Sequence, residues 1–199
     1  MHKNHQRFTF FSSILLLSML CGAASAADWT LDNEASQLNF VSIKAGNIAE
    51  THTFDELMGH ISESGAAELS ITLDSVNTAI DIRNERMRTM LFDTASAPKA
   101  TIKTSIDAAM LNDLEPGQSM LTTVEAMLDL SGTQSTITAE LQVFKLNAST
   151  LLVSTHKPIL LNATNLGLEA GVEKLREVAG LPAISLAVPV SFTLLFTAS

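Results

Sequence analysis

The chain has 199 residues, of which 46% are hydrophobic, and its 12 basic and 21 acidic residues give a formal net charge of −9 at pH 7. Such an acidic chain is poorly suited to binding nucleic acid or anionic lipid surfaces, because both carry negative charge. Cys21 is the sole cysteine, so the sequence contains no intrachain disulfide framework.

The first 26 residues have the pattern of a secretory signal peptide. Lys3 and Arg7 precede an apolar run over residues 8–20, and Ala-Ser-Ala follows at residues 24–26. A basic start, an apolar middle and an A-x-A ending are typical of a leader that is removed after export. The run is shorter than the roughly 20 residues of a membrane-spanning helix. We therefore expect cleavage after Ala26 and no transmembrane span in the mature chain.

Cys21 offers a rival interpretation, because lipoproteins are cut just before a cysteine that is then acylated. That processing requires a small residue before the cysteine, whereas Leu20 occupies this position. Removing 26 of the 199 residues, with Lys3 and Arg7 among them, leaves 173 residues with 10 basic and 21 acidic side chains, a charge of −11. This size predicts one domain over residues 27–199. Its lack of cysteine excludes a thiol nucleophile and a cysteine-based zinc site.

The mature sequence is dominated by alternation of apolar and polar residues, which is typical of strands with one buried face. Gly132 follows Ser131 between two such runs and predicts a hairpin. Eight strands are expected, a number that can close into an antiparallel barrel around side chains or one small ligand. They cover residues 36–44, 51–61, 68–74, 100–107, 120–130, 133–145, 151–162 and 184–196.

Two segments depart from the β pattern and predict short helices. Residues 81–91 are rich in helix formers, and apolar residues recur at helical spacing over residues 168–179. Gly180 and Pro182 then provide a left-handed cap and a stop. Pro189 lies inside the last expected strand, which indicates an edge position or a bulge there. The predicted fold class is all-β, an eight-stranded antiparallel barrel with two short helices.

The sequence carries no recognisable catalytic or metal-binding constellation. His52, His60 and His156 are the histidines left after cleavage, and none has a second histidine or a paired carboxylate at ligand spacing. Serine-nucleophile, calcium-loop and phosphate-loop motifs are missing. We therefore expect no catalytic residues, no metal and no required cofactor, and an enzyme ranks behind a binding protein.

Three arginines crowd one segment of the first expected helix. Arg83, Arg86 and Arg88 lie close to the apolar residues Leu91 and Phe92. In an exposed helix these arginines form an ordinary solvated face. At the open end of a barrel the same arginines would hydrogen-bond a polar head group while the apolar residues contact its tail. The sequence leaves both interpretations open.

Several motifs resemble those of the YceI-like family, exported proteins with an extended lipocalin-like barrel. Residues 29–32 (Trp-Thr-Leu-Asp) resemble the family's aromatic-x-Ile/Leu-Asp opening, and residues 35–40 resemble its next strand. Residues 54–60 resemble its G-x-F-x-x-F-x-G segment, with His52 in place of the first glycine. The hairpin at residues 128–133 resembles the family's strand–N-G–strand pair. The resemblance extends from Trp29 to about residue 144.

The most specific resemblance is Ser-Val-Asn-Thr at residues 75–78, followed by residues 83–88, Phe92 and Pro98. The family has S-V-x-T, then R-D-x-H-L-R, a phenylalanine and a Tyr-Pro pair. The helix expected over residues 168–179 is not part of the family's pattern, which marks a divergent member. The chain also departs from the motif at four positions. These are Asn84 for the aspartate, Arg86 for the histidine, Met87 for the leucine and Ala97 for the tyrosine.

The resemblance implies a periplasmic protein that holds an isoprenoid, such as a quinone, or another amphiphilic lipid inside the barrel. Arg83, Arg86 and Arg88 are then the head-group candidates. The expected lumen residues are Phe40, Phe54, Met87, Leu91, Phe92, Leu128, Leu141 and Phe144, the last of which is off the parity of its strand. The implied partner is an apolar or amphiphilic small molecule that is transported, stored or sequestered, with a homodimer as a further hypothesis. The alternative is a stress-related or structural protein that acts through a protein partner and has a packed barrel.

Overall fold

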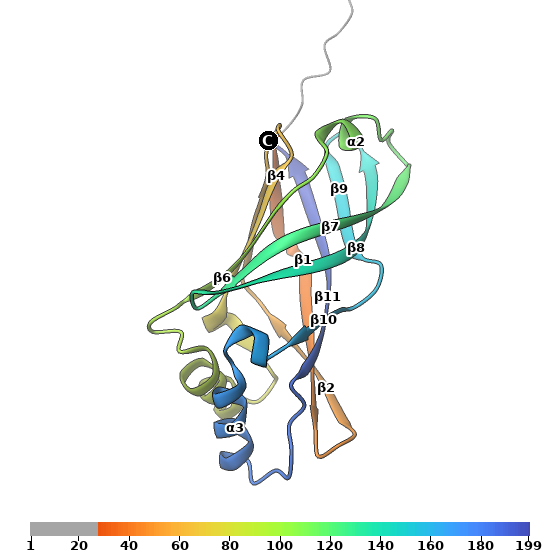
Figure 1. Ribbon diagram of the computed structural model, residues 1–199. Coiled ribbons are helices and arrows are strands. Elements are labelled where there is room, and N and C mark those ends of the chain that lie inside the picture. Colours follow the sequence, from red (N-terminus) through yellow and green to blue (C-terminus); the bar gives the residue numbers. More distant parts are fainter. Residues whose placement is uncertain (1–27) are drawn as a thin grey trace, which may run out of the picture.

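A computed structural model describes residues 28–199, so the predicted signal peptide lies outside the described residues. The strands of this part form one sheet that closes on itself in the order β1-β11-β9-β8-β7-β6-β4-β3-β1, an antiparallel barrel of eight strands with a lipocalin-like fold (Figure 1). Its members are β1 (Trp29–Lys44), β3 (Leu57–Ile61), β4 (Ala66–Thr72), β6 (Lys99–Ser105), β7 (Ser119–Leu130), β8 (Thr133–Asn147), β9 (Thr150–Thr155) and β11 (Ala187–Ala198). The expected fold class is confirmed.

The barrel closes through the pairing of the first and last strands. The β1–β11 register runs from Trp29 opposite Ala198 to Phe40 opposite Val190. The first strand begins at Trp29, seven residues before the expected start at residue 36. Polar residues interrupt the alternation after Leu31, and the register shifts between Asp32 and Gln37, as expected for a β-bulge.

Strands β1 and β11 are long enough to continue beyond the barrel. The start of β1 pairs with β3, whereas its end pairs with β2 (Ile48–Phe54). In the same way, the end of β11 pairs with β9 and its start pairs with β10 (Ile159–Asn162). The two-residue strand β5 (Val76–Asn77) pairs with β2 at the edge of this extension. The sheet therefore forms a barrel at one end and an open, curved extension at the other.

Two strands of the sequence analysis are each divided in the structure. The segment expected as one strand over residues 51–61 is β2 and β3, which separate at Asp55 and Glu56. The side chain of Asn33 holds this bend, because its amide donates to Asp55 O (3.1 Å) and its Oδ1 accepts from Leu57 N (2.7 Å). The segment over residues 151–162 is β9 and β10, which are interrupted before Pro158. The first bend leads the chain from the extension into the barrel, and the second leads it from the barrel into the extension.

Helices cover the concave side of the extension (Figure 1). α1 (Asp81–Arg86) continues as a π-helical turn, η2 (Met87–Phe92), and α3 (Glu169–Val178) packs against that turn. Short 3₁₀ turns, η1 (Leu73–Ser75) and η3 (Thr164–Leu166), complete the covering. Both predicted helices are therefore confirmed. At the opposite end of the barrel lies α2 (Ala108–Asn112), which the sequence analysis does not anticipate.

The predicted cap of α3 at Gly180 and the predicted interruption of strand pairing at Pro189 are also confirmed. Gly180 adopts a φ of 62°, the left-handed conformation expected of a helix cap. Pro189 pairs with Leu160 of β10. The pairing of β11 with β1 covers only the residues after it, from Val190 onward. Pro189 thus lies where its missing N–H interrupts no hydrogen bond to β1.

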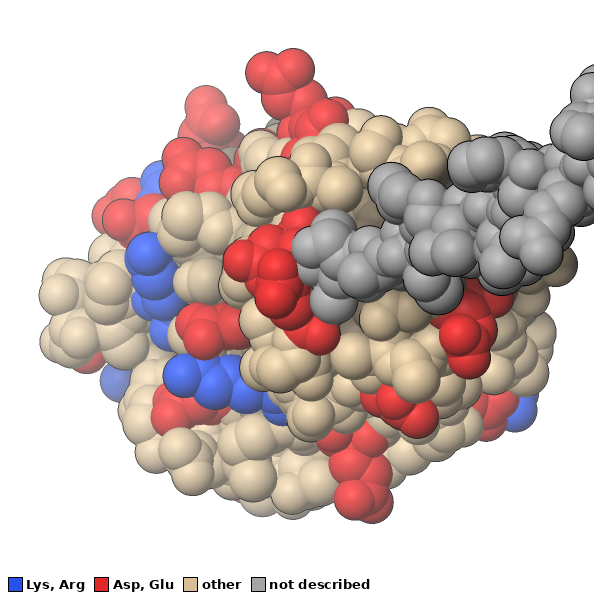
Figure 2. Space-filling model, turned by 90° about the horizontal axis from the view of Figure 1, so that it is seen from above, with Lys and Arg blue, Asp and Glu red and all other residues tan. Residues whose placement is uncertain are grey.

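Acidic side chains outnumber basic ones on the face seen from the α2 end. Most of this face is uncharged; the acidic side chains are spread over it, and the fewer basic side chains lie mostly on one side (Figure 2). Within residues 28–199, none of the helices combines the length and the apolar character needed to cross a membrane.

Close contact between α3 and η2 depends on Gly171. A Cβ atom at this position would lie 2.8 Å from Met90 O and 2.9 Å from Leu91 Cα, and backbone atoms cannot move aside as a flexible side chain can. Gly171→Leu is therefore expected to lower the free energy of unfolding by about 2 kcal/mol or more, although leucine is the better helix former. The matched control is Ala170→Leu, at the exposed neighbouring position, with a change within about 0.5 kcal/mol. Urea denaturation measures both, and equal stability of the two variants would contradict the tight contact.

Candidate ligand-binding site

The barrel encloses a cavity of about 440 Å³ between its inward-facing side chains. Alternate residues of β7, β8 and β9, such as Val124, Leu141 and Val153, point into this cavity, together with Leu194 of β11. Near α2 the cavity reaches the surface, because β6 pairs with β7 only over residues 100–104 and then diverges from it. We call this opening the mouth.

A second cavity of about 150 Å³ lies between the extension and its helical cover. Every residue that lines it is Ala, Val, Ile, Leu or Phe. The sheet contributes residues such as Phe40 and Val188, η2 contributes Leu91, and α3 contributes Val172. Hydrocarbon chains suit such a space, because an apolar cavity of this size stays dry.

The two cavities are adjacent and share part of their walls. Ile102 of β6, Ile137 of β8 and Phe192 of β11 line both cavities, and so does Ile159 of β10. These four residues form a waist between a wide compartment in the barrel and a narrow one beneath the helices. We use the term lumen for the two compartments together.

Six of the eight predicted ligand residues line the lumen. Phe40, Phe54, Leu91, Phe92 and Leu128 line the narrow compartment, and Leu141 lines the wide one. Met87 is buried, with 6% exposure, but it is not among the residues that line either compartment.

Phe144 does not face the lumen, so its expected placement is wrong. Its neighbour in β8, Val143, is buried and lines the wide compartment, and successive side chains of a strand point to opposite faces. Phe144 pairs with Leu152 of β9, which likewise lies between the inward residues Leu151 and Val153. The physical reason is the uninterrupted register of β7 and β8, which leaves no bulge to turn Phe144 inward.

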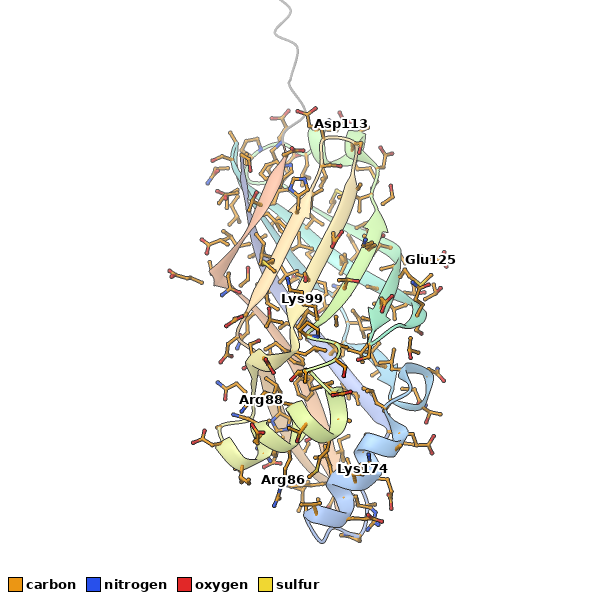
Figure 3. All side chains as sticks on the ribbon, turned by 90° about the vertical axis from the view of Figure 1, so that its left-hand side faces the viewer. Arg86, Arg88, Lys99, Asp113, Glu125 and Lys174 are labelled. Carbon is orange, nitrogen blue, oxygen red and sulfur yellow. The ribbon has the colours of Figure 1, made fainter. Side chains whose placement is uncertain are left out.

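The structure separates the three head-group candidates. Arg83 points toward the sheet, where its guanidinium donates to Glu50 Oε2 (2.8 Å) and to Thr78 O (2.6 Å). Arg88 instead pairs with Glu85 on its own helical segment (3.1 Å). Arg86 makes no ion pair within residues 28–199. Arg86 and Arg88 both lie at the helix-covered end, far from Asp113 at the α2 end (Figure 3).

A group of polar residues that the sequence analysis does not single out surrounds Arg83. Ser42 and Lys44 of β1 and Glu50 and His52 of β2 form it together with Arg83, and we call these five residues the polar cluster. Lys44 Nζ lies 2.6 Å from Glu50 Oε2, and Ser42 Oγ lies 2.8 Å from His52 Nε2. The cluster is adjacent to the lumen, because the rings of Phe40 and His52 are in contact with centroids 5.2 Å apart.

Charge in the polar cluster is set by burial and by close ion pairs. The hydrogen bond from Lys44 and the charge of Arg83 lower the pKa of Glu50 against the opposing effect of burial, so this carboxylate is ionised at neutral pH. Burial, followed by the positive charge of Arg83, lowers the pKa of His52 below its ordinary value of 6.5. His52 is therefore a neutral imidazole at pH 7.

The described residues offer no metal centre. Within residues 28–199, no three His, Cys, Asp or Glu side chains come together in a way that would hold a metal ion. The site is thus a lumen with mostly apolar walls and a polar cluster beside its narrow end.

Together, the closed eight-stranded sheet, its extension and the apolar lumen define a class of protein, the lipocalin-like barrels with an internal cavity. Sequence and structural comparison then narrows the class. The chain belongs to the YceI-like family, because the YceI-like domain model matches residues 29–196.

Two solved structures illustrate this relationship. A polyisoprenoid-binding domain from Saccharophagus degradans, implicated in plant cell wall breakdown, is 46% identical and superposes with a TM-score of 0.84 over 86% of this chain and 98% of that domain. BcnA from Burkholderia cenocepacia has the same fold at 18% identity, with a TM-score of 0.62 over 83% of this chain and 98% of BcnA. No curated protein matches the sequence significantly.

The lowered pKa of His52 predicts a pH-dependent stability. The unfolded chain takes up a proton at His52 near pH 6.5. The folded chain takes it up only at lower pH, because burial and the positive charges of Arg83 and Lys44 outweigh the negative charge of Glu50. The free energy of unfolding of the wild type therefore falls as the pH drops through 6.5 toward the folded pKa. His52→Asn has no imidazole to protonate. Its stability relative to the wild type therefore rises as the pH is lowered from about 8 to about 5.

Urea denaturation across this pH range measures the effect. His156→Asn, at an exposed position, is the control and should follow the pH profile of the wild type. Parallel profiles for the wild type and His52→Asn would contradict a buried, neutral His52.

Proposed function

We propose that the chain binds an uncharged, chain-like apolar molecule in its lumen and carries, stores or sequesters it. An isoprenoid, such as the tail of a quinone, or another amphiphilic lipid suits this space best. The observation that carries the proposal is that the two compartments are adjacent and share apolar walls at Ile102, Ile137 and Phe192. The 46% identity to a polyisoprenoid-binding domain supports the same ligand class.

The energetics of the narrow compartment favour occupation. An empty cavity destabilises a protein by roughly 24 cal/mol per Å³, so 150 Å³ left empty corresponds to about 4 kcal/mol. Water gains little there because the walls provide no hydrogen-bond partners. A hydrocarbon chain recovers this energy and adds about 0.8 kcal/mol for each buried CH₂ group, less the cost of ordering the ligand.

The charges around the mouth favour an uncharged ligand. Glu68, Asp107 and Glu125 line the wide compartment near the surface, and Lys103, which lies 3.4 Å from Glu68, balances one of these three charges without lining the compartment itself. Figure 3 places Glu125 on the side of the barrel, along β7. A ligand with a phosphate or carboxylate head would have to pass these carboxylates, and like charges repel.

Binding is preferred to catalysis and to the protein-partner alternative on structural grounds. The narrow compartment is lined only by hydrocarbon side chains, which supply neither nucleophile nor proton-transfer group. The alternative of a protein that acts only through a protein partner requires a packed barrel, whereas this barrel is hollow. The signal-peptide pattern of residues 1–26 supports a periplasmic location for the proposed carrier.

Native mass spectrometry of the purified mature protein tests the proposal directly. We expect a mass increment that disappears on solvent extraction and returns when a prenylquinone or a polyprenol is added. Failure to find or load any such molecule, in protein shown to be folded, would overturn the proposed function.

Blocking the waist tests whether the ligand uses both compartments. Ile137→Trp adds an indole where the two cavities meet and should weaken binding of a long-chain isoprenoid by tenfold or more, about 1.4 kcal/mol. A short-chain analogue, which fits one compartment, should be affected less.

The matched control for this experiment is Thr138→Trp, on the exposed outer face of the same strand. Fluorescence titration measures affinity for both chain lengths. Equal loss of affinity for both chain lengths, or loss with Thr138→Trp, would argue against a chain that threads the waist.

A further inference from the structure

Two buried polar atoms in the described residues have no hydrogen-bond partner, and both belong to the polar cluster. They are His52 Nδ1 and Arg83 Nε. His52 is only 3% exposed, on the inner face of β2, and Arg83 approaches it from α1. Buried polar groups in folded proteins are nearly always paired, so these two atoms point to a partner that the described residues do not themselves supply.

The other polar atoms of these two residues are already engaged. The terminal nitrogens of Arg83 donate to Glu50 and to Thr78 O, and His52 Nε2 is hydrogen-bonded to Ser42 Oγ. The unpartnered groups are the Nε–H of Arg83 and one nitrogen of a neutral imidazole, which donates or accepts according to its tautomer. A phosphate or carboxylate is best held by two parallel N–H groups of an arginine, and here both terminal nitrogens already donate to Glu50 and Thr78. The remaining pair suits a single uncharged oxygen.

The polar cluster lies directly behind one wall of the lumen. Phe40 lines the narrow compartment and also contacts His52, and its centroid lies 5.3 Å from that of Phe54. The Phe40 side chain therefore lies between the narrow compartment and the cluster, and its displacement would join the two. The mouth lies at the other end of the lumen and carries carboxylates.

We propose that His52 and Arg83 form a head-group site that receives one uncharged oxygen, a hydroxyl or a carbonyl, of an isoprenoid that enters head first. The oxygen accepts from Arg83 Nε and completes the hydrogen bonding of His52 Nδ1, while the tail lies along the lumen toward the mouth. This inference rests on the proposed function and assigns a role to His52, which the three-arginine hypothesis does not include. Of the three arginines, it places only Arg83 in the head-group site.

Comparing ligands with and without an oxygen tests the proposal. Binding of a prenol, a prenylquinone and a prenyl hydrocarbon of equal tail length is measured with the wild type, His52→Phe and His52→Asn. We expect His52→Phe to weaken the oxygen-bearing ligand by about tenfold, as for one lost hydrogen bond in a buried site, and to leave the hydrocarbon unchanged. His52→Asn places an amide group near the position of Nδ1 and should restore much of the affinity.

The matched control is Thr51→Phe, one residue away on the exposed face of β2, which should bind all ligands as the wild type does. The prenol and prenylquinone arms show whether a hydroxyl or a carbonyl is received. Equal effects of His52→Phe on the prenol and the hydrocarbon, or no effect on either oxygen-bearing ligand, would overturn the head-group site. Failure of the wild type to bind any of the ligands would instead overturn the proposed function.

A spectroscopic measurement on the wild type complements the variants. In protein labelled with ¹⁵N-histidine, the Nδ1 resonance of His52 should shift when an oxygen-bearing ligand is added and stay in place when the hydrocarbon is added. An Nδ1 resonance that ignores the prenol and the quinone would contradict the proposal even if a variant failed to fold.

Discussion

The space inside an eight-stranded barrel must be filled by side chains or by another molecule, and here the side chains do not fill it. Alternation along each strand directs one apolar set inward, and residues such as Ala126, Ala139 and Val124 are too small to meet across the axis. Protein interiors otherwise pack as densely as organic crystals, so a cavity of about 440 Å³ is a departure that the sequence maintains. The barrel, its extension and the helical cover are best understood as a container built around this space.

The extension determines how far that space continues. Because β1 and β11 run on beyond the barrel, the chain gains a second apolar surface that needs covering, and α3 and η2 cover it. Gly171 lets the two helical segments approach closely enough to close the narrow compartment. Where the apolar lining ends, behind Phe40, the polar cluster begins. The lumen thus changes from acidic at its mouth to apolar along its length and to hydrogen-bonding beside its closed end.

Local sequence patterns were sufficient to predict most of this fold. Strict alternation gave β4, β6, β7 and β8 and the inward direction of Leu128 and Leu141. The bend at Asp55 was missed because it depends on the side chain of Asn33, which lies about twenty residues earlier in the chain. The polar cluster was missed for a similar reason: His52 and Arg83 are brought together by packing of the β1–β2 hairpin against α1, and no local pattern connects the two residues. Tertiary contacts of this kind leave no periodic signal in the sequence.

Nuclear Overhauser effects between a bound isoprenoid and the methyl groups of the protein measure the central property, an interior open to a hydrocarbon chain. A ligand in the lumen predicts cross-peaks from its methyl groups to Ile102, Ile137 and Val172, which line the waist and the narrow compartment. Cross-peaks confined to the outward-facing Leu152 and Leu195, with none to the interior residues, would show that the lumen is closed to the ligand and would contradict this view of the molecule.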